Sequence, residues 1–236
     1  MFFDPLYWIV IAIGGAISLW AASRTKGQFA RFSKFTTRCG MTGAQVARRI
    51  LADNGISDVD VERVAGTLSD HYDPRNRVLR LSEGVHDSRS MAAFGVAAHE
   101  VGHAIQHAQG YKFLEFRSAW VPFASKGGSI SIIVLIIAAV LGGVTTPAGS
   151  VMALVGLLAF SCTTLFTLIT LPVEFDASRR ALIALEQGGY TTPEELQGAK
   201  KVLDAAAMTY VAAFVTSLMA LLYWAYRLGL FGGRRG

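Results

Sequence analysis

The segment "AAHEVGHAIQH", residues 97–107, contains three of the five histidines of the chain. On a helix, His99 and His103 lie on one face with their Cβ atoms about 5–6 Å apart. Two imidazoles at this spacing can bind one Zn²⁺ ion. Glu100 follows the first histidine, on the flank where it can take a proton from an activated water and pass it to a leaving amine. This H-E-x-x-H pattern predicts a zinc site with a general base.

A catalytic zinc normally has three protein ligands and one position for water. His107 is the nearest candidate for the third ligand, but on an unbroken helix it lies about 12 Å along the axis from His99. Gly110, the residue that could bend the chain back, comes after His107 rather than before it. His107 is therefore expected beside the site or at the surface. An acidic residue from elsewhere is the alternative, and Glu174 is favoured over Asp176.

The hydrophobic fraction is 52% and mean hydropathy is +0.40, while only 17% of residues are charged. Charges are absent from residues 5–23, 127–173 and 205–226. The first and last runs each fit one membrane crossing of about 20 residues. The middle run is too long for one crossing and contains the turn-like stretch "GGVTTPAG", so it predicts two crossings joined by a hairpin. Two crossings then separate Glu174 from the histidine helix, which returns it to the same side of the membrane.

The predicted organisation has four membrane helices and a polar domain in two parts. The helices are 5–23, 121–144, 149–173 and 205–228, and the domain parts are 24–120 and 174–204, with the H-E-x-x-H helix at about 88–109. No basic residue precedes the first apolar run, which favours a retained anchor over a cleaved signal peptide. Five basic residues follow that run and place the polar domain on the cytoplasmic side: Arg24, Lys26, Arg31, Lys34 and Arg38.

Local signals predict the elements of the polar domain, and the fold class is mainly α with a small β-hairpin or sheet. Thr42 and Gln45 form a potential capping box at the start of a helix over 41–55. "VDVERV" and the two halves of "GTLSDHYDPRNRVLRLS", divided by a turn at residues 73–76, are typical of short strands. Thr192 is placed to cap a further helix that continues towards the last crossing. The net charge of +5 requires no nucleic-acid partner, and the two cysteines imply no disulfide.

The stretches "GVAAHEVGHAIQH", "SDHYDPRNRVLRLS" and "PVEFDASRRA" resemble the YugP-type family of bacterial membrane zinc metallopeptidases, in order and over nearly the whole chain. A wider similarity to HtpX-type membrane gluzincins is also present. The resemblance implies a gluzincin-like zinc protease domain in the bacterial cytoplasmic membrane. It also implies that His99, His103 and Glu174 bind Zn²⁺ and that Glu100 is the general base.

In the wider group the third ligand belongs to a pattern R-E-x-x-A-D, and this chain departs from it twice. Val173 replaces the arginine, and Ser178 replaces the aspartate that usually orients a zinc-binding histidine. Ser178 can still form a weaker hydrogen bond. Among other polar residues, His71 could stabilise a transition state or simply belong to a turn. Arg179 could reach an oxyanion or simply flank a helix.

The sequence favours a zinc-dependent membrane endopeptidase that cleaves membrane-associated or unfolded proteins. Its partners would be a protein or peptide substrate and the lipid bilayer, and a homo-oligomer is left open. The alternative is a membrane scaffold with a structural or vestigial zinc site. Such sites usually close all four positions, mostly with cysteine, and no cysteine accompanies these histidines. A zinc transporter would need ionisable residues within its membrane spans, and the three charge-free runs offer none.

Overall fold

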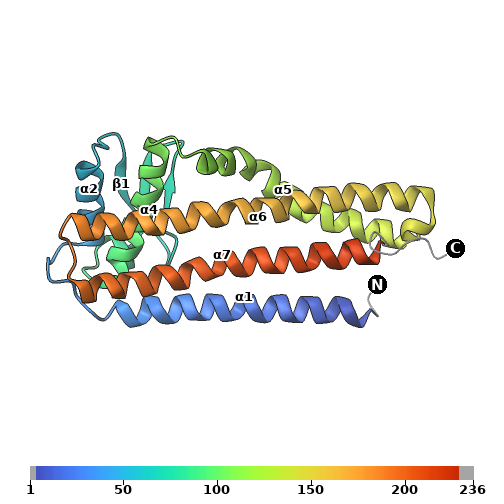
Figure 1. Cartoon of the computed structure of the whole chain (residues 1–236), viewed down its shortest axis with the longest axis horizontal. Coiled ribbons are helices and arrows are strands. Elements are labelled where there is room, and N and C mark those ends of the chain that lie inside the picture. Colours follow the sequence, from blue (N-terminus) through green and yellow to red (C-terminus); the bar gives the residue numbers. More distant parts are fainter. Residues whose placement is uncertain (1–3, 229–236) are drawn as a thin grey trace. The chain divides into compact units, whose positions relative to one another are not determined.

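The computed structural model describes residues 4–228, with the side chains of these residues except 125–127 and 129. Most of the chain is helical, with one small sheet of three strands, as the fold class predicted (Figure 1). The helices and strands follow in the order α1 (Pro5–Phe32), α2 (Gly43–Asp53), β1 (Asp60–Val64), β2 (His71–Asp73), β3 (Val78–Ser82), α3 (Glu83–His86), α4 (Met91–Ala108), α5 (Lys112–Val140), α6 (Pro147–Gln187) and α7 (Pro193–Arg227), with a 3₁₀ turn at Gly143–Thr145.

The chain divides into two compact units, and the division falls within the long helices. The first contains residues 1–20, 116–171 and 210–236, and the second contains residues 21–115 and 172–209. Three described helices are long and apolar enough to cross a membrane: α1, α6 and α7. The fourth predicted crossing, 121–144, coincides with the later part of α5, where the described side chains form a shorter apolar helix, Ile130–Val140. The number of four crossings therefore stays a prediction.

The helix cap and the turn predicted in the polar region are present in the structure. Thr42 accepts a hydrogen bond from the Gln45 backbone N–H and donates its own N–H to the Gln45 side chain, so the capping box of α2 is complete. Gly55, just beyond α2, has a φ of +68°, a conformation that a side chain disfavours. Asp73 accepts hydrogen bonds from the backbone N–H groups of Arg75 and Asn76, which stabilises the turn between β2 and β3.

The sheet has the order β1-β3-β2. Strand β3 pairs antiparallel with β2, as the hairpin prediction requires, and parallel with β1. The parallel pairing was not predicted, because β2 lies between β1 and β3 in the sequence and no single turn joins the paired strands. Strand β3 is the central strand and is the most buried of the three.

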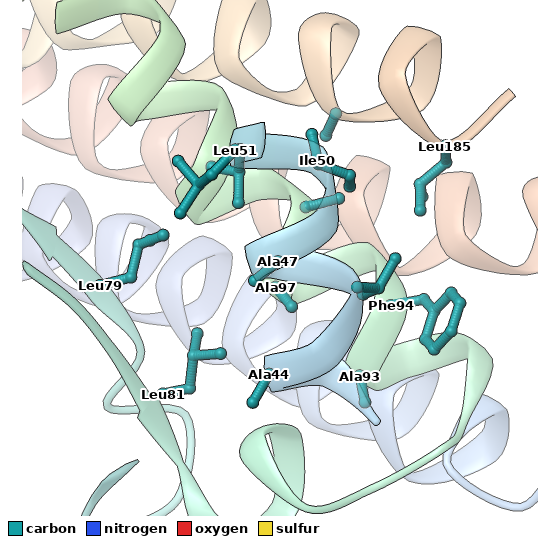
Figure 2. Packing of buried hydrophobic residues seen from close by; sticks show 14 of the residues in the cluster. Ala44, Ala47, Ile50, Leu51, Leu79, Leu81, Ala93, Phe94, Ala97 and Leu185 are labelled. Atoms are coloured by element: carbon teal, nitrogen blue, oxygen red, sulfur yellow. The ribbon is translucent and has the colours of Figure 1, made fainter. Parts of the chain in front are cut away.

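The core of the second unit forms where α2 and α4 pack on each other and on β3. Figure 2 shows the small side chains Ala44, Ala47, Ala93 and Ala97 between these elements, with Leu79 and Leu81 projecting from the strand. Small residues at a helix contact let the backbones approach closely. The core therefore packs α4, the helix with the H-E-x-x-H pattern, against α2 and the sheet.

Candidate metal centre

Helix α4 presents its two histidines as the i, i+4 spacing predicts. The helix begins after Ser90, whose side chain accepts a hydrogen bond from the backbone N–H of Ala93. The rings of His99 and His103 lie with their centroids 4.8 Å apart and their planes at 82°. Both side chains are largely buried. Ring orientations are thus set by the protein rather than by solvent.

Glu174 on α6 meets both imidazoles. Its Oε2 lies 3.2 Å from His99 Nε2 and 3.6 Å from His103 Nε2. The side chain is almost completely buried, with an exposed fraction of 1% for the residue. The structure therefore brings together the three residues that were predicted from the sequence as metal ligands. Of these, His99 and Glu174 lie 75 residues apart in the chain.

The donor set fits a zinc ion. Tetrahedral zinc with ligands at about 2.0–2.2 Å requires neighbouring donor atoms about 3.3 Å apart. The two measured distances from Glu174 Oε2, 3.2 and 3.6 Å, lie on either side of that value. One ligand atom from each of His99, His103 and Glu174 lies within 4.8 Å of the others. Two imidazoles and a carboxylate are also a ligand set that catalytic zinc uses.

Gly102 permits the close approach of α4 and α6. A Cβ atom at this position would lie 2.4 Å from the carbonyl oxygen of Ala177, well inside the contact distance that real Cβ atoms show. Ala177 is one turn after Glu174 on the same helix. The glycine between the two histidines thus has a role in the site that the H-E-x-x-H pattern does not express.

Glu100 lies in the same buried region and is fixed by the sheet. Its Oε2 accepts a hydrogen bond of 3.0 Å from the backbone N–H of Tyr72 in β2. Burial raises the pKa of Glu100 to about 7, and the charges of Glu174 and Asp70 act in the same direction, while His99 opposes them. A carboxyl group with a pKa near neutrality can both accept and return a proton at physiological pH.

The pKa of Glu174 is shifted in the opposite direction from that of Glu100. It stands just past the charge-free run that ends at Val173. Burial by itself raises its pKa, but hydrogen bonds and charge from His103 and His99 outweigh burial and hold the pKa well below its ordinary value. The residue is therefore ionised, which is the state that a metal ligand requires.

In each of the two histidines the ring nitrogen outside the cluster, Nδ1, also has a hydrogen-bond partner. His99 Nδ1 lies 3.1 Å from the Ser178 hydroxyl, so Ser178 forms the hydrogen bond that the sequence allowed it. His103 Nδ1 lies 3.0 Å from the side-chain oxygen of Gln106. Neither Gln106 nor the backbone of Tyr72 was predicted from the sequence as part of the site. For Gln106 a signal existed, because a glutamine within an apolar helix stretch must find partners when buried.

The remaining candidates lie outside the cluster. His107 Nδ1 lies 2.8 Å from the Tyr72 hydroxyl, and both residues line a cavity of about 280 Å³, so His107 is beside the site and is not a member of the metal cluster. The exposed His71 ring contacts the carbonyl of Ser69. Asp176, the competitor for the third ligand, binds Arg179 at 2.5 Å. For His71 and Arg179, stabilisation of a transition state stays a prediction.

Two imidazoles from an H-E-x-x-H helix, a buried glutamate from a later helix and an adjacent carboxyl group form a set of residues that zinc metallopeptidases use. A family model described as "Putative neutral zinc metallopeptidase" matches residues 7–229. The chain belongs to this family, and Zn²⁺ is its cofactor.

A relative of this chain occurs in Bacillus subtilis (strain 168), where it carries the name "Putative membrane protease YugP". The two are 44% identical over 217 residues, which cover 92% of this chain and 93% of the relative. The resemblance drawn from the sequence is therefore confirmed. No solved structure matches the chain. With three apolar helices of sufficient length, the chain is a membrane protein.

Proposed function

We propose that this protein is a zinc-dependent membrane endopeptidase that hydrolyses peptide bonds of membrane-associated or unfolded proteins. The observation that carries the proposal is the cluster of His99, His103 and Glu174 with Glu100 buried beside it. The family is one of zinc metallopeptidases, and the relative is named as a membrane protease. Cleavage within chains rather than at their ends, and the nature of the substrate, are parts of the proposal.

His99, His103 and Glu174 would hold the metal through the three atoms that already face one another. When bound, zinc supplies Lewis acidity that activates water and polarises a scissile carbonyl. Glu100 accepts the proton of the attacking water and later donates it to the leaving amine. The Tyr72 backbone N–H fixes one oxygen of Glu100, so the carboxyl group has a defined orientation for both transfers.

The site argues against a purely structural metal. In the described part of the chain the cluster has three members, and none of them is a cysteine. A structural zinc site closes four positions with protein ligands, whereas a catalytic site leaves one position open. The buried carboxyl group next to the cluster has a use in hydrolysis and none in a structural site.

The proposed topology has four crossings, with 121–144 as the second, and with both parts of the polar domain on the cytoplasmic side of a bacterial membrane. Basic residues close to a crossing favour the cytoplasmic side. Arg24, Lys26 and Arg31 lie in the part of α1 that belongs to the second unit, the unit that also contains the metal centre. The substrate would then be cleaved at the cytoplasmic surface.

The decisive experiment replaces Glu100 with glutamine in detergent-purified protein. We expect casein hydrolysis to fall by about 10²- to 10⁴-fold, the contribution of general acid–base catalysis, while bound zinc is unchanged. The control is Glu186→Gln, which changes an exposed residue of α6 and should leave both quantities as in the wild type. Full hydrolysis by Glu100→Gln would refute the mechanism. Zinc binding by a wild-type protein that cleaves no protein substrate would support the scaffold alternative.

A further inference from the structure

Gln106 is the most completely enclosed polar side chain near the metal centre, with an exposed fraction of 0%. It lies on α4 three residues after His103 and contacts α6 with its amide. A buried amide must satisfy a carbonyl oxygen and two N–H groups. All three have partners here, and the identity of these partners determines which way the amide points.

The amide nitrogen of Gln106 faces two acceptors. Nε2 donates to the backbone oxygen of Val173 at 2.9 Å and to the carboxylate of Asp176 at 2.9 Å. Neither acceptor offers a proton: one is a carbonyl, and the other is a carboxylate that also accepts hydrogen bonds from Arg179 and Arg180. A flipped amide would place its oxygen against two further oxygens. The orientation is therefore fixed by α6.

The fixed amide determines the orientation of the His103 ring. Gln106 Oε1 can only accept, so it binds the N–H of Nδ1, which lies 3.0 Å away. The other ring nitrogen, Nε2, then faces the Glu174 carboxylate within the cluster. The ring therefore presents Nε2 to a metal ion and keeps Nδ1 on Gln106.

We propose that Gln106 is a positioning residue for zinc: it sets the ring orientation of His103 and couples it to the helix that carries Glu174. This inference rests on the proposed zinc site. Partners that bind the second ring nitrogen of a zinc-ligating histidine typically contribute 10- to 100-fold in metal affinity. The same amide also bonds to residues 173 and 176, which flank Glu174, so one side chain aligns ligands from both helices.

The first test uses the wild-type protein and requires no change at Gln106. Histidine-ring ¹⁵N NMR of the zinc-loaded protein reports which ring nitrogen binds the metal and which keeps its proton, and His103→Gln assigns the signal. We expect the metal on Nε2 of His103 and a proton on Nδ1. A metal bound to Nδ1 would overturn the proposal.

The second test measures zinc affinity by competition with a chelator. We expect Gln106→Leu to weaken zinc binding by about 10- to 100-fold. The control is Gln109→Leu at the C-cap of the same helix, since Gln109 contacts Arg180 rather than His103, and its zinc affinity should match that of the wild type. Wild-type zinc affinity in Gln106→Leu would overturn the proposal, as would an equal loss in both variants.

A compensating pair covers the case in which Gln106→Leu does not fold. Gln106→Glu puts an oxygen against Asp176, and adding Asp176→Asn supplies an N–H there instead. The double variant should bind zinc more tightly than Gln106→Glu by about 10-fold. If the two bind zinc equally, the proposal fails. A wild-type protein that binds no zinc would refute both the proposed function and this proposal, whereas equal zinc affinities in a zinc-binding wild type and in Gln106→Leu would refute this proposal alone.

Discussion

Replacing Gly102 with alanine tests whether the close contact of α4 and α6 forms the metal centre. The added Cβ would lie 2.4 Å from the Ala177 oxygen, 3.0 Å from its carbonyl carbon and 3.1 Å from its Cα. All three atoms are backbone, so no side-chain rotation relieves the clash. Ordinary contact begins at 3.4 Å, and the helices must therefore separate by about 1 Å.

Two free-energy terms oppose each other in this variant. Alanine is better than glycine in a helix interior by about 1 kcal/mol. Overpacking costs typically about 1–3 kcal/mol, and a clash between backbones belongs at the upper end of that range. The net loss is about 2 kcal/mol, which lowers Tm by roughly 4–8 °C in a protein of this size.

The effect on the metal should exceed the effect on stability. Glu174 moves with Ala177, because both belong to α6, and its distances of 3.2 and 3.6 Å to the imidazoles increase. Metal ligands tolerate departures of only about 0.2 Å. We expect zinc affinity to fall by at least about 10-fold, a loss of about 1.4 kcal/mol, measured by chelator competition.

Two other helix glycines provide graded controls. A Cβ at Gly27 of α1 would meet nothing within 4 Å, so Gly27→Ala should be neutral or slightly stabilising. At Gly95 of α4 the Cβ would lie 3.3 Å from the Ala199 backbone, which predicts a small effect on Tm and none on zinc. An unchanged Tm and zinc affinity in Gly102→Ala would refute the reasoning, as would the same loss in all three variants.

Two further predictions concern charge and topology. Because the pKa of Asp176 is lowered in the folded protein, the ionised group contributes stability above its ordinary pKa of 3.8, and this contribution is lost as the pH falls through its folded pKa. Asp176→Asn should therefore lower Tm at neutral pH, with a difference that shrinks below pH 3.8; a constant difference would contradict the argument. Cys39 is exposed and lies in the second unit, so in a Cys162→Ser background a membrane-impermeant maleimide should label inside-out vesicles and not intact cells. Labelling of intact cells would reverse the proposed orientation.

The features that could be predicted from the sequence are those in which neighbours along the chain decide the outcome. The capping box of Thr42 and Gln45 closes within one turn, and the spacing of His99 and His103 is a property of any helix. Glu174 could be predicted because the charge-free run before it accommodates two crossings, which return the chain to the side of the membrane where the histidine helix lies. It was favoured over Asp176 before the resemblance was drawn, and Asp176 binds arginines instead.

The missed contacts depend on tertiary packing. The Tyr72 N–H reaches Glu100 because β2 packs on α4, and a backbone group leaves no signature in sequence. Gln106 finds Val173 and Asp176 only because α4 and α6 approach closely. The types and spacing of residues in the sequence predict which chemistry they can perform. Their hydrogen-bond partners on other elements depend on how those elements pack, which the sequence does not show directly.

The surroundings of the two carboxyl groups of the site shift their pKa values in opposite directions. Glu174 and Glu100 are both buried, yet the imidazoles hold the pKa of Glu174 well below its ordinary value, while burial raises that of Glu100 to about 7. Pairs of titratable groups pushed apart in this way identify which is a permanent charge and which exchanges protons. A cation at the cluster would favour the charged form of Glu100 by attraction and shift its titration towards lower pH. The base would then be available at neutral pH, and Glu174 would stay a ligand throughout.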